Sequence, residues 1–119
     1  MRLVALTISY PRSGLEEHGP EDPLCFYEFV DLELEVVDEL RHYFARFQCA
    51  VTTPQWVANE LVRARAVWGA GNLLIGRWDR ASIADAFRAL TDPSVDRDWP
   101  LLLQRLERVL GASPDAIDP

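Results

Sequence analysis

The two carboxylates Glu33 and Glu35 have the spacing that comes closest to a catalytic pair. On one face of a β-strand, residues two positions apart have Cα atoms roughly 7 Å apart, and paired carboxylates at comparable separations hydrolyse glycosidic bonds. However, Asp31 precedes them at the same period. A row of three acids is more typical of a solvated or partner-binding face than of a catalytic pocket, so a small carboxylate enzyme is the weaker interpretation.

The other residues with reactive side chains do not form a recognisable site. Cys25 and Cys49, with His18 and His42, match neither a zinc-ligand spacing nor a disulfide framework. The chain also has no G-x-G-x-x-G motif, no phosphate-binding loop and no G-x-S-x-G elbow. We therefore predict that the protein is not an enzyme and that it uses no metal and no cofactor.

The charge of the chain is unevenly distributed. Residues 1–40 contain two arginines and ten acids, whereas residues 41–119 contain ten arginines and nine acids, so the net charge of −7 arises entirely in the first third. An anionic surface repels phosphate backbones, which argues against direct nucleic-acid binding. The same surface would attract a basic protein and accelerate its association.

Length and hydropathy indicate one folded domain outside the membrane. A chain of 119 residues, 49% of them hydrophobic, buries a core without disulfides or metals. No run of 18 apolar residues is present, and the N-terminal segment lacks the features of a signal peptide. We expect a cytoplasmic protein with a single domain over residues 1–111 and a flexible tail over residues 112–119.

A β-hairpin is the preferred interpretation of residues 26–51. Alternate residues from Phe26 to Val36 are apolar except for Glu28, and the sequence alternates again over Tyr43–Val51 after a polar turn at residues 38–42. A helix over residues 30–47 is the alternative, because Leu, Glu and Arg also suit helices. In the hairpin, Asp31, Glu33 and Glu35 share a solvent face with Tyr27 and Phe29.

Other elements follow from periodicity and from helix caps. Residues 2–10 alternate as a strand with Val4, Leu6, Ile8 and Tyr10 towards the core, residues 11–23 read as an exposed loop, and residues 72–78 as a short buried strand. Helices are predicted after Thr53-Pro54, with an apolar stripe from Trp56 to Ala64, after Ser82, and after Asp98, the last ending at Gly111. The order βββαβαα predicts an α+β fold, with a mainly antiparallel sheet of about four strands and three helices packed on it.

The predicted partner surface combines aromatic anchors with acids, since exposed aromatics contribute strongly to interfaces. It consists of the hairpin face, the turn and part of the loop, namely Tyr27, Phe29, Asp31, Glu33, Glu35, Asp38, Glu39, Glu16 and Glu17. The protein would act as a monomer, or as a homodimer in which residues 24–37 pair along an exposed strand edge.

From Phe47 to Arg108 the sequence resembles the immunity-protein-8 family of bacterial polymorphic-toxin systems. The resemblance is carried by the strand Phe47–Val51 running into Thr53-Pro54-Gln55-Trp56, by Leu73-Leu74-Ile75 with Arg77-Trp78-Asp79, by Ile83, and by Trp99 at the start of the last helix. The strand Leu32–Val36 also matches. The chain departs from the family in its short C-terminal segment and in residues 69–72, and no binding residue is carried over.

The resemblance implies a protein that binds and neutralises a cognate toxin domain encoded beside it. Many such toxins are nucleases, whose basic surfaces an acidic face would complement. An alternative is a phage or regulatory protein that mimics nucleic-acid charge to inhibit a host nuclease.

Overall fold

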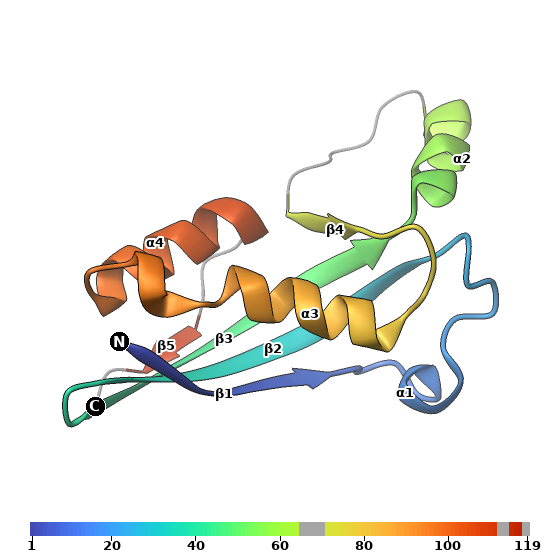
Figure 1. Cartoon of the computed structure of the whole chain (residues 1–119). Helices are drawn as coiled ribbons and strands as arrows, with labels where there is room; N and C mark the ends of the chain where they lie inside the picture. Colours follow the sequence, from blue (N-terminus) through green and yellow to red (C-terminus); the bar gives the residue numbers. More distant parts are fainter. Residues whose placement is uncertain (65–70, 112–114, 118–119) are drawn as a thin grey trace.

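The chain forms a five-stranded sheet with two helices lying across one of its faces (Figure 1). The computed structural model describes residues 1–64, 71–111 and 115–117, the last three by their backbone alone. The strands follow the spatial order β1-β2-β3-β4, and β5 also pairs with β3; their bounds are Arg2–Ser9 (β1), Tyr27–Asp38 (β2), Arg41–Thr52 (β3), Asn72–Leu74 (β4) and Asp115–Ile117 (β5). The predicted α+β class and the mainly antiparallel sheet are confirmed.

The hairpin β2–β3 is the centre of the sheet. Its twelve residue pairs run from Tyr27 opposite Thr52 to Asp38 opposite Arg41. Glu39, at the turn, adopts a positive φ of 57°, as tight hairpin turns require. The alternative helix over residues 30–47 is therefore wrong, because the period-two pattern determines the structure here. Strand β3 pairs with all of β2, whereas β1 pairs with residues 31–37 alone, so within the described residues positions 27–30 of β2 lack a strand partner on that side, and the homodimer considered above stays a prediction.

The core lies between the sheet and the helices α3 (Arg80–Leu90) and α4 (Trp99–Leu110). Both helices are on the same side of the sheet (Figure 1). Buried side chains come from alternate positions of the hairpin and from one face of each helix: Val30, Leu32, Leu34, Val36, Ala45, Phe47, Cys49, Val51, Ile83, Phe87, Trp99, Leu102, Leu106 and Leu110. The opposite face of the sheet receives neither helix.

The caps of α4 are those that the sequence predicts, whereas the start of α3 differs. Asp98 accepts a hydrogen bond from the Leu101 N–H, and Gly111 ends α4 in a left-handed conformation. The predicted cap Ser82 instead lies inside α3, where its hydroxyl donates to Asp79. Asp79 accepts from the Ala81 N–H and is the true N-cap, because its carboxylate has the same capping ability and lies four positions before the apolar stripe begins at Ile83.

Strand β1 has an irregularity that changes which of its residues face the core. The register with β2 shifts between Leu3 and Ala5, so Leu3 packs against the core and Val4 is 43% exposed. The prediction that Val4 faces the core is therefore wrong, whereas Leu6, Ile8 and Tyr10 do pack against it. A β-bulge of this kind inserts one residue and reverses the alternation locally.

Two connecting segments also differ from the prediction. The loop after β1 contains a short helix, α1 (Leu15–His18), whose Leu15 is fully buried. The expected strand over residues 72–78 is limited to β4, which runs parallel to β3 and is only partly buried. Residues 93–95 form a short 3₁₀ helix, η1 (Pro93–Val95), between α3 and α4.

The largest correction concerns α2 (Pro54–Ala64). Its apolar stripe from Trp56 to Ala64 predicts a helix packed on the sheet, but none of its residues is buried. Leu61 is 44% exposed and Val62 is 86% exposed. The helix extends from the end of β3, away from α3 and α4 (Figure 1). Of the predicted C-terminal tail, residues 115–117 form β5 instead, while residues 112–114 and 118–119 lie outside the described part of the chain.

Candidate functional site

The face of the sheet opposite α3 and α4 brings together the central residues of the predicted partner surface. We call it the open face and define it by the outward side chains of the hairpin: Tyr27, Phe29, Asp31, Glu33 and Glu35 from β2, and His42, Phe44, Arg46 and Gln48 from β3. Phe29 is 47% exposed and Phe44 is 37% exposed. Large aromatic side chains in such numbers on one solvent-facing surface are typical of an interface.

Two of the three acids of the open face have partners on β3 that the sequence prediction did not include. Glu33 lies opposite Arg46, with 3.5 Å between their charged atoms, and the Glu35 carboxylate lies 2.8 Å from the His42 Nδ1 atom. Asp31 lies opposite Gln48. Because the pairs are solvent-exposed, they stabilise the fold little, and they leave both carboxylates reachable. The open face therefore carries more acidic than basic side chains, and its positive charge, Arg46, lies on β3 among the acids of β2.

One end of the open face is aromatic. The Tyr27 ring lies 5.5 Å from the Phe29 ring and 4.6 Å from the Trp56 ring, between centroids. Trp56 belongs to α2, so the start of this helix borders the open face. The aromatic cluster therefore joins two elements.

Two buried threonines fix α2 at that position. The Thr53 hydroxyl oxygen accepts from the backbone N–H groups of Phe26 and Trp56, and the Thr52 hydroxyl donates to the Phe26 carbonyl. Both threonines are fully buried. The Thr-Thr-Pro junction thus acts as scaffold for the aromatic cluster, in agreement with its prediction as a helix start.

A small hollow lies near the middle of the open face. Its volume is about 90 Å³, and it is lined by Ala5 and Thr7 of β1 together with Glu33, Glu35 and Phe44. The small side chains of β1 leave this space beside the larger ones of the hairpin. The hollow has room for the end of one partner side chain, and it is far too shallow to enclose a substrate.

The remaining predicted residues do not join the open face. Asp38 and Glu39 lie at the hairpin turn, at the opposite end of β2 from Tyr27. Glu16 and Glu17 lie on α1, where the Glu16 carboxylate pairs with Arg80, the first residue of α3. These four acids are therefore separate from Asp31, Glu33 and Glu35, which occupy the middle of β2.

Sequence reasoning missed the residues contributed by β3 and α2. His42, Phe44 and Arg46 alternate with the core positions of β3, so the period that predicts the buried set also predicts that they point outward. Trp56 was missed for another reason, because its helical stripe predicted that it would pack in the core. The periodicity of apolar residues therefore indicates the outward side chains of β3 correctly, whereas in α2 it is misleading.

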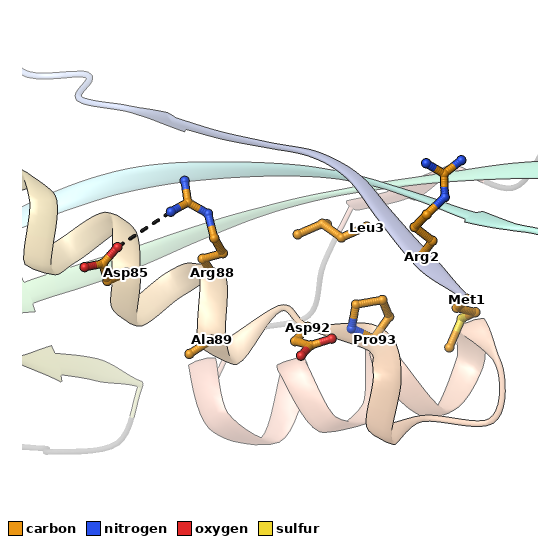
Figure 2. A pocket seen from close by; sticks show the side chains of 8 residues that line it. All are labelled: Met1, Arg2, Leu3, Asp85, Arg88, Ala89, Asp92 and Pro93. Carbon is orange, nitrogen blue, oxygen red and sulfur yellow. Dashed lines mark ion pairs between the residues drawn. The ribbon is translucent and has the colours of Figure 1, made fainter.

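A second depression, between β1 and α3, does not assemble a catalytic group. It measures about 510 Å³ and is lined by Met1, Arg2, Leu3, Asp85, Arg88, Ala89, Asp92 and Pro93. Figure 2 shows Arg88 directed towards Asp85, while Arg2 points away from Asp92. The charged groups do not converge on a common point, which acid–base chemistry would need.

The two cysteines differ sharply in accessibility. Cys49 is 3% exposed, and burial raises the pKa of its thiol from 9.0 to about 11. Such an increase lowers the thiolate fraction about 100-fold at pH values below 9. Cys25 is partly exposed, and its sulfur lies 3.5 Å from the Asn59 side-chain nitrogen.

We expect iodoacetamide at pH 8 to alkylate Cys25 in the native protein and to leave Cys49 unmodified, because reaction requires an accessible thiolate. In urea both cysteines should react, since unfolding removes the burial that raises the Cys49 pKa. Mass spectrometry of the digested peptides measures both rates in one sample. Equal native rates would contradict the prediction.

Within the ranges that the structure describes, no three or more His, Cys, Asp or Glu side chains are grouped so that they could hold a metal ion. In the same part of the chain, none of the helices combines the length and apolar character that crossing a membrane requires.

Residues 5–111 match the sequence model of the family described as immunity protein 8. Neither a curated protein nor a solved structure is significantly similar to the chain. The matched range contains the whole hairpin, α2, α3 and α4, and therefore every residue of the open face.

Proposed function

Because the chain belongs to the immunity protein 8 family, we propose that it neutralises a cognate toxin domain by binding that domain with its open face. Immunity proteins of polymorphic toxin systems are non-enzymatic inhibitors of toxins. Inhibition therefore depends on a surface rather than on a catalytic site. Family membership also favours a cognate toxin over a host nuclease as the target.

The observation that carries the proposal is the open face of the hairpin, which no helix covers in the part of the chain that the structure describes. The solvent-facing side of the sheet carries Tyr27, Phe29 and Phe44, all at least partly exposed. Apolar side chains gathered on one exposed surface are typical of an interaction site. Aromatic side chains anchor interfaces, and neighbouring acids accelerate the approach of a basic partner. Both contributions are present on the same strands.

The charge pattern supports a partner with a basic and structured surface. Asp31 and Glu33 would meet cations of the toxin, whereas Arg46, which lies opposite Glu33, would need an acid or a polar group nearby. A nuclease toxin has the required basic surface, because it must hold nucleic acid. The alternation of charge then contributes specificity as well as attraction, since a misplaced like charge weakens binding.

Reversing the acids of the open face tests the proposal. We expect Asp31→Arg, Glu33→Arg and Glu35→Arg together to weaken binding to the product of the neighbouring toxin gene at least 100-fold, because close charge pairs across interfaces have coupling energies of about 1.5–7 kcal/mol. The salt dependence of the association rate should fall as well. Titration calorimetry and stopped-flow fluorescence measure the two effects.

A matched control reverses three acids elsewhere. Glu17, Glu39 and Asp85 are exposed and lie outside the open face, and changing them to arginine alters the net charge by the same amount. This control should retain affinity within a few-fold. If the control loses affinity and the open-face variant keeps it, the toxin binds elsewhere and the proposed surface is wrong.

A further inference from the structure

A groove lies beside the aromatic end of the open face, between the loop that precedes β2 and the start of α2. Its volume is about 780 Å³, and its lining is Arg12, Pro20, Glu21, Asp22, Pro23, Cys25, Phe26, Tyr27, Glu28 and Trp56. Besides the buried Phe26, Tyr27 and Trp56 contribute two ring systems, which are tilted by 33° to each other. Both rings are partly exposed, so the groove offers aromatic surface to an incoming group.

The charge of the groove is negative. Three of its side chains are acidic and one is basic, and the basic one, Arg12, is already paired with Glu28. Asp22 uses one carboxylate oxygen to accept the Leu24 N–H. Within the part of the chain that the structure describes, no ion pair involves Glu21 or Asp22. Two carboxylates therefore remain to attract a cation.

Two of the lining residues, Arg12 and Glu28, form an arginine–carboxylate pair. The Arg12 Nε atom lies 3.0 Å from one Glu28 oxygen, and an Arg12 Nη atom lies 2.7 Å from the other. This is the two-point geometry in which arginine matches a carboxylate. The side chain of Glu28 is 16% exposed and that of Arg12 is 52% exposed, so the carboxylate of this pair is largely shielded from water and its guanidinium is not.

We propose that the groove receives an arginine side chain of the bound toxin domain. The inference rests on the proposed function and identifies a second contact for the same partner. A guanidinium group would stack on the Trp56 ring and donate hydrogen bonds to Glu21 and Asp22. Both contacts favour arginine over lysine, because the planar guanidinium stacks on aromatic rings and donates in a fork, whereas an ammonium is a compact and strongly hydrated charge.

The groove and the open face form one continuous surface. Tyr27 belongs to both, since its ring contacts Phe29 on the open face and Trp56 at the groove. A toxin domain that covers the open face therefore extends to the groove without a gap. Because α2 is not buried in the core, Trp56 lies beside the sheet, where it lines the groove.

Two variants and one control test the groove. We expect Trp56→Ala and Glu21→Lys each to weaken binding to the neighbouring gene's toxin domain at least 10-fold in titration calorimetry. Asp85→Lys, the same charge change on α3, should alter affinity less than 2-fold. Glu21 is exposed in a loop, so Glu21→Lys should unfold at the wild-type temperature. It decides the outcome if Trp56→Ala proves unstable.

The partner residue is identified from the toxin side. Among alanine variants of the toxin's arginines, one should weaken binding to the wild type about 10-fold and cause less than a 2-fold further loss with Glu21→Lys. Lysine at that position should not restore the affinity. If no toxin arginine couples to Glu21, or if lysine restores the affinity fully, the proposal is wrong.

The outcomes separate this inference from the proposed function. Wild-type affinity in both groove variants, with a large loss in the open-face variant, would overturn the groove and leave the open face supported. A large loss in the groove variants alone would support the groove and overturn the open face. Unchanged affinity in all of them would overturn both.

Discussion

Replacing Phe87 with alanine is expected to lower the free energy of unfolding by about 3–5 kcal/mol. Phe87 lies on α3, is 2% exposed and belongs to the cluster that packs α3 and α4 against the hairpin. Its removal leaves a cavity that the close-packed neighbours cannot fill. Urea denaturation followed by circular dichroism measures the change. Because small domains have a total stability of about 5–15 kcal/mol, this loss is a large fraction of the free energy of unfolding.

The same substitution on the other face of the sheet is the control. Phe44 is 37% exposed on β3, so Phe44→Ala should cost less, about 1–2 kcal/mol, because part of the residue is already in water in the folded protein and no enclosed cavity is created. Its effect should appear in toxin binding instead. If the two variants lost similar stability, the two faces would not have the different roles proposed for them.

The period of the hairpin made the centre of the candidate site predictable. Alternation alone places Asp31, Glu33 and Glu35 on one face, because residues two apart in a strand always point the same way. The same rule predicts the outward positions of Phe44 and Arg46 once β3 is accepted as a strand. That Arg46 would lie opposite Glu33 requires the register, which depends on the two-residue turn at Glu39.

The surroundings of α2 were not predictable from its own sequence. An amphipathic stripe indicates that a helix has an apolar side, but it does not identify what that side contacts. Here α3 and α4 supply the buried helix faces of the core, and Trp56 contacts Tyr27 instead. Contacts of this kind depend on residues distant in sequence, as does the pair between Glu16 and Arg80, which are 64 positions apart.

The bulge in β1 could not be predicted from the sequence of the strand either. The strand itself was predicted, but an inserted residue changes the facing of Leu3 and Val4 without changing the composition of the strand. The bulge breaks the alternation of inward and outward side chains in β1, and it arises from the way in which β1 pairs with β2. The sequence pattern of β1 therefore predicts its existence and most of its core residues, and fails at the position where β2 determines the register.

Arg105 was not predicted to have any role, yet replacing it with alanine is expected to lower the free energy of unfolding by about 2–4 kcal/mol. Its guanidinium donates to the Leu90 carbonyl at 2.6 Å, to the Asp92 carbonyl at 2.9 Å and to the Asp96 carboxylate at 2.9 Å. It thereby links the end of α3 and the segment around η1 to α4. Alanine would leave Asp96, whose side chain is 9% exposed, without its cation.

Arg88→Ala provides the matched control for Arg105→Ala. Arg88 pairs with Asp85 on the exposed side of α3, where both side chains are more than half exposed, so its loss should cost no more than about 0.5 kcal/mol. A double-mutant cycle then isolates the link: Asp96→Ala should destabilise Arg105→Ala much less than it destabilises the wild type, since the interaction is already absent. If the two losses of unfolding free energy are additive, Arg105 stabilises the fold through its two carbonyl contacts and not through the carboxylate. If Arg105→Ala loses no more stability than Arg88→Ala, the predicted role of Arg105 is wrong.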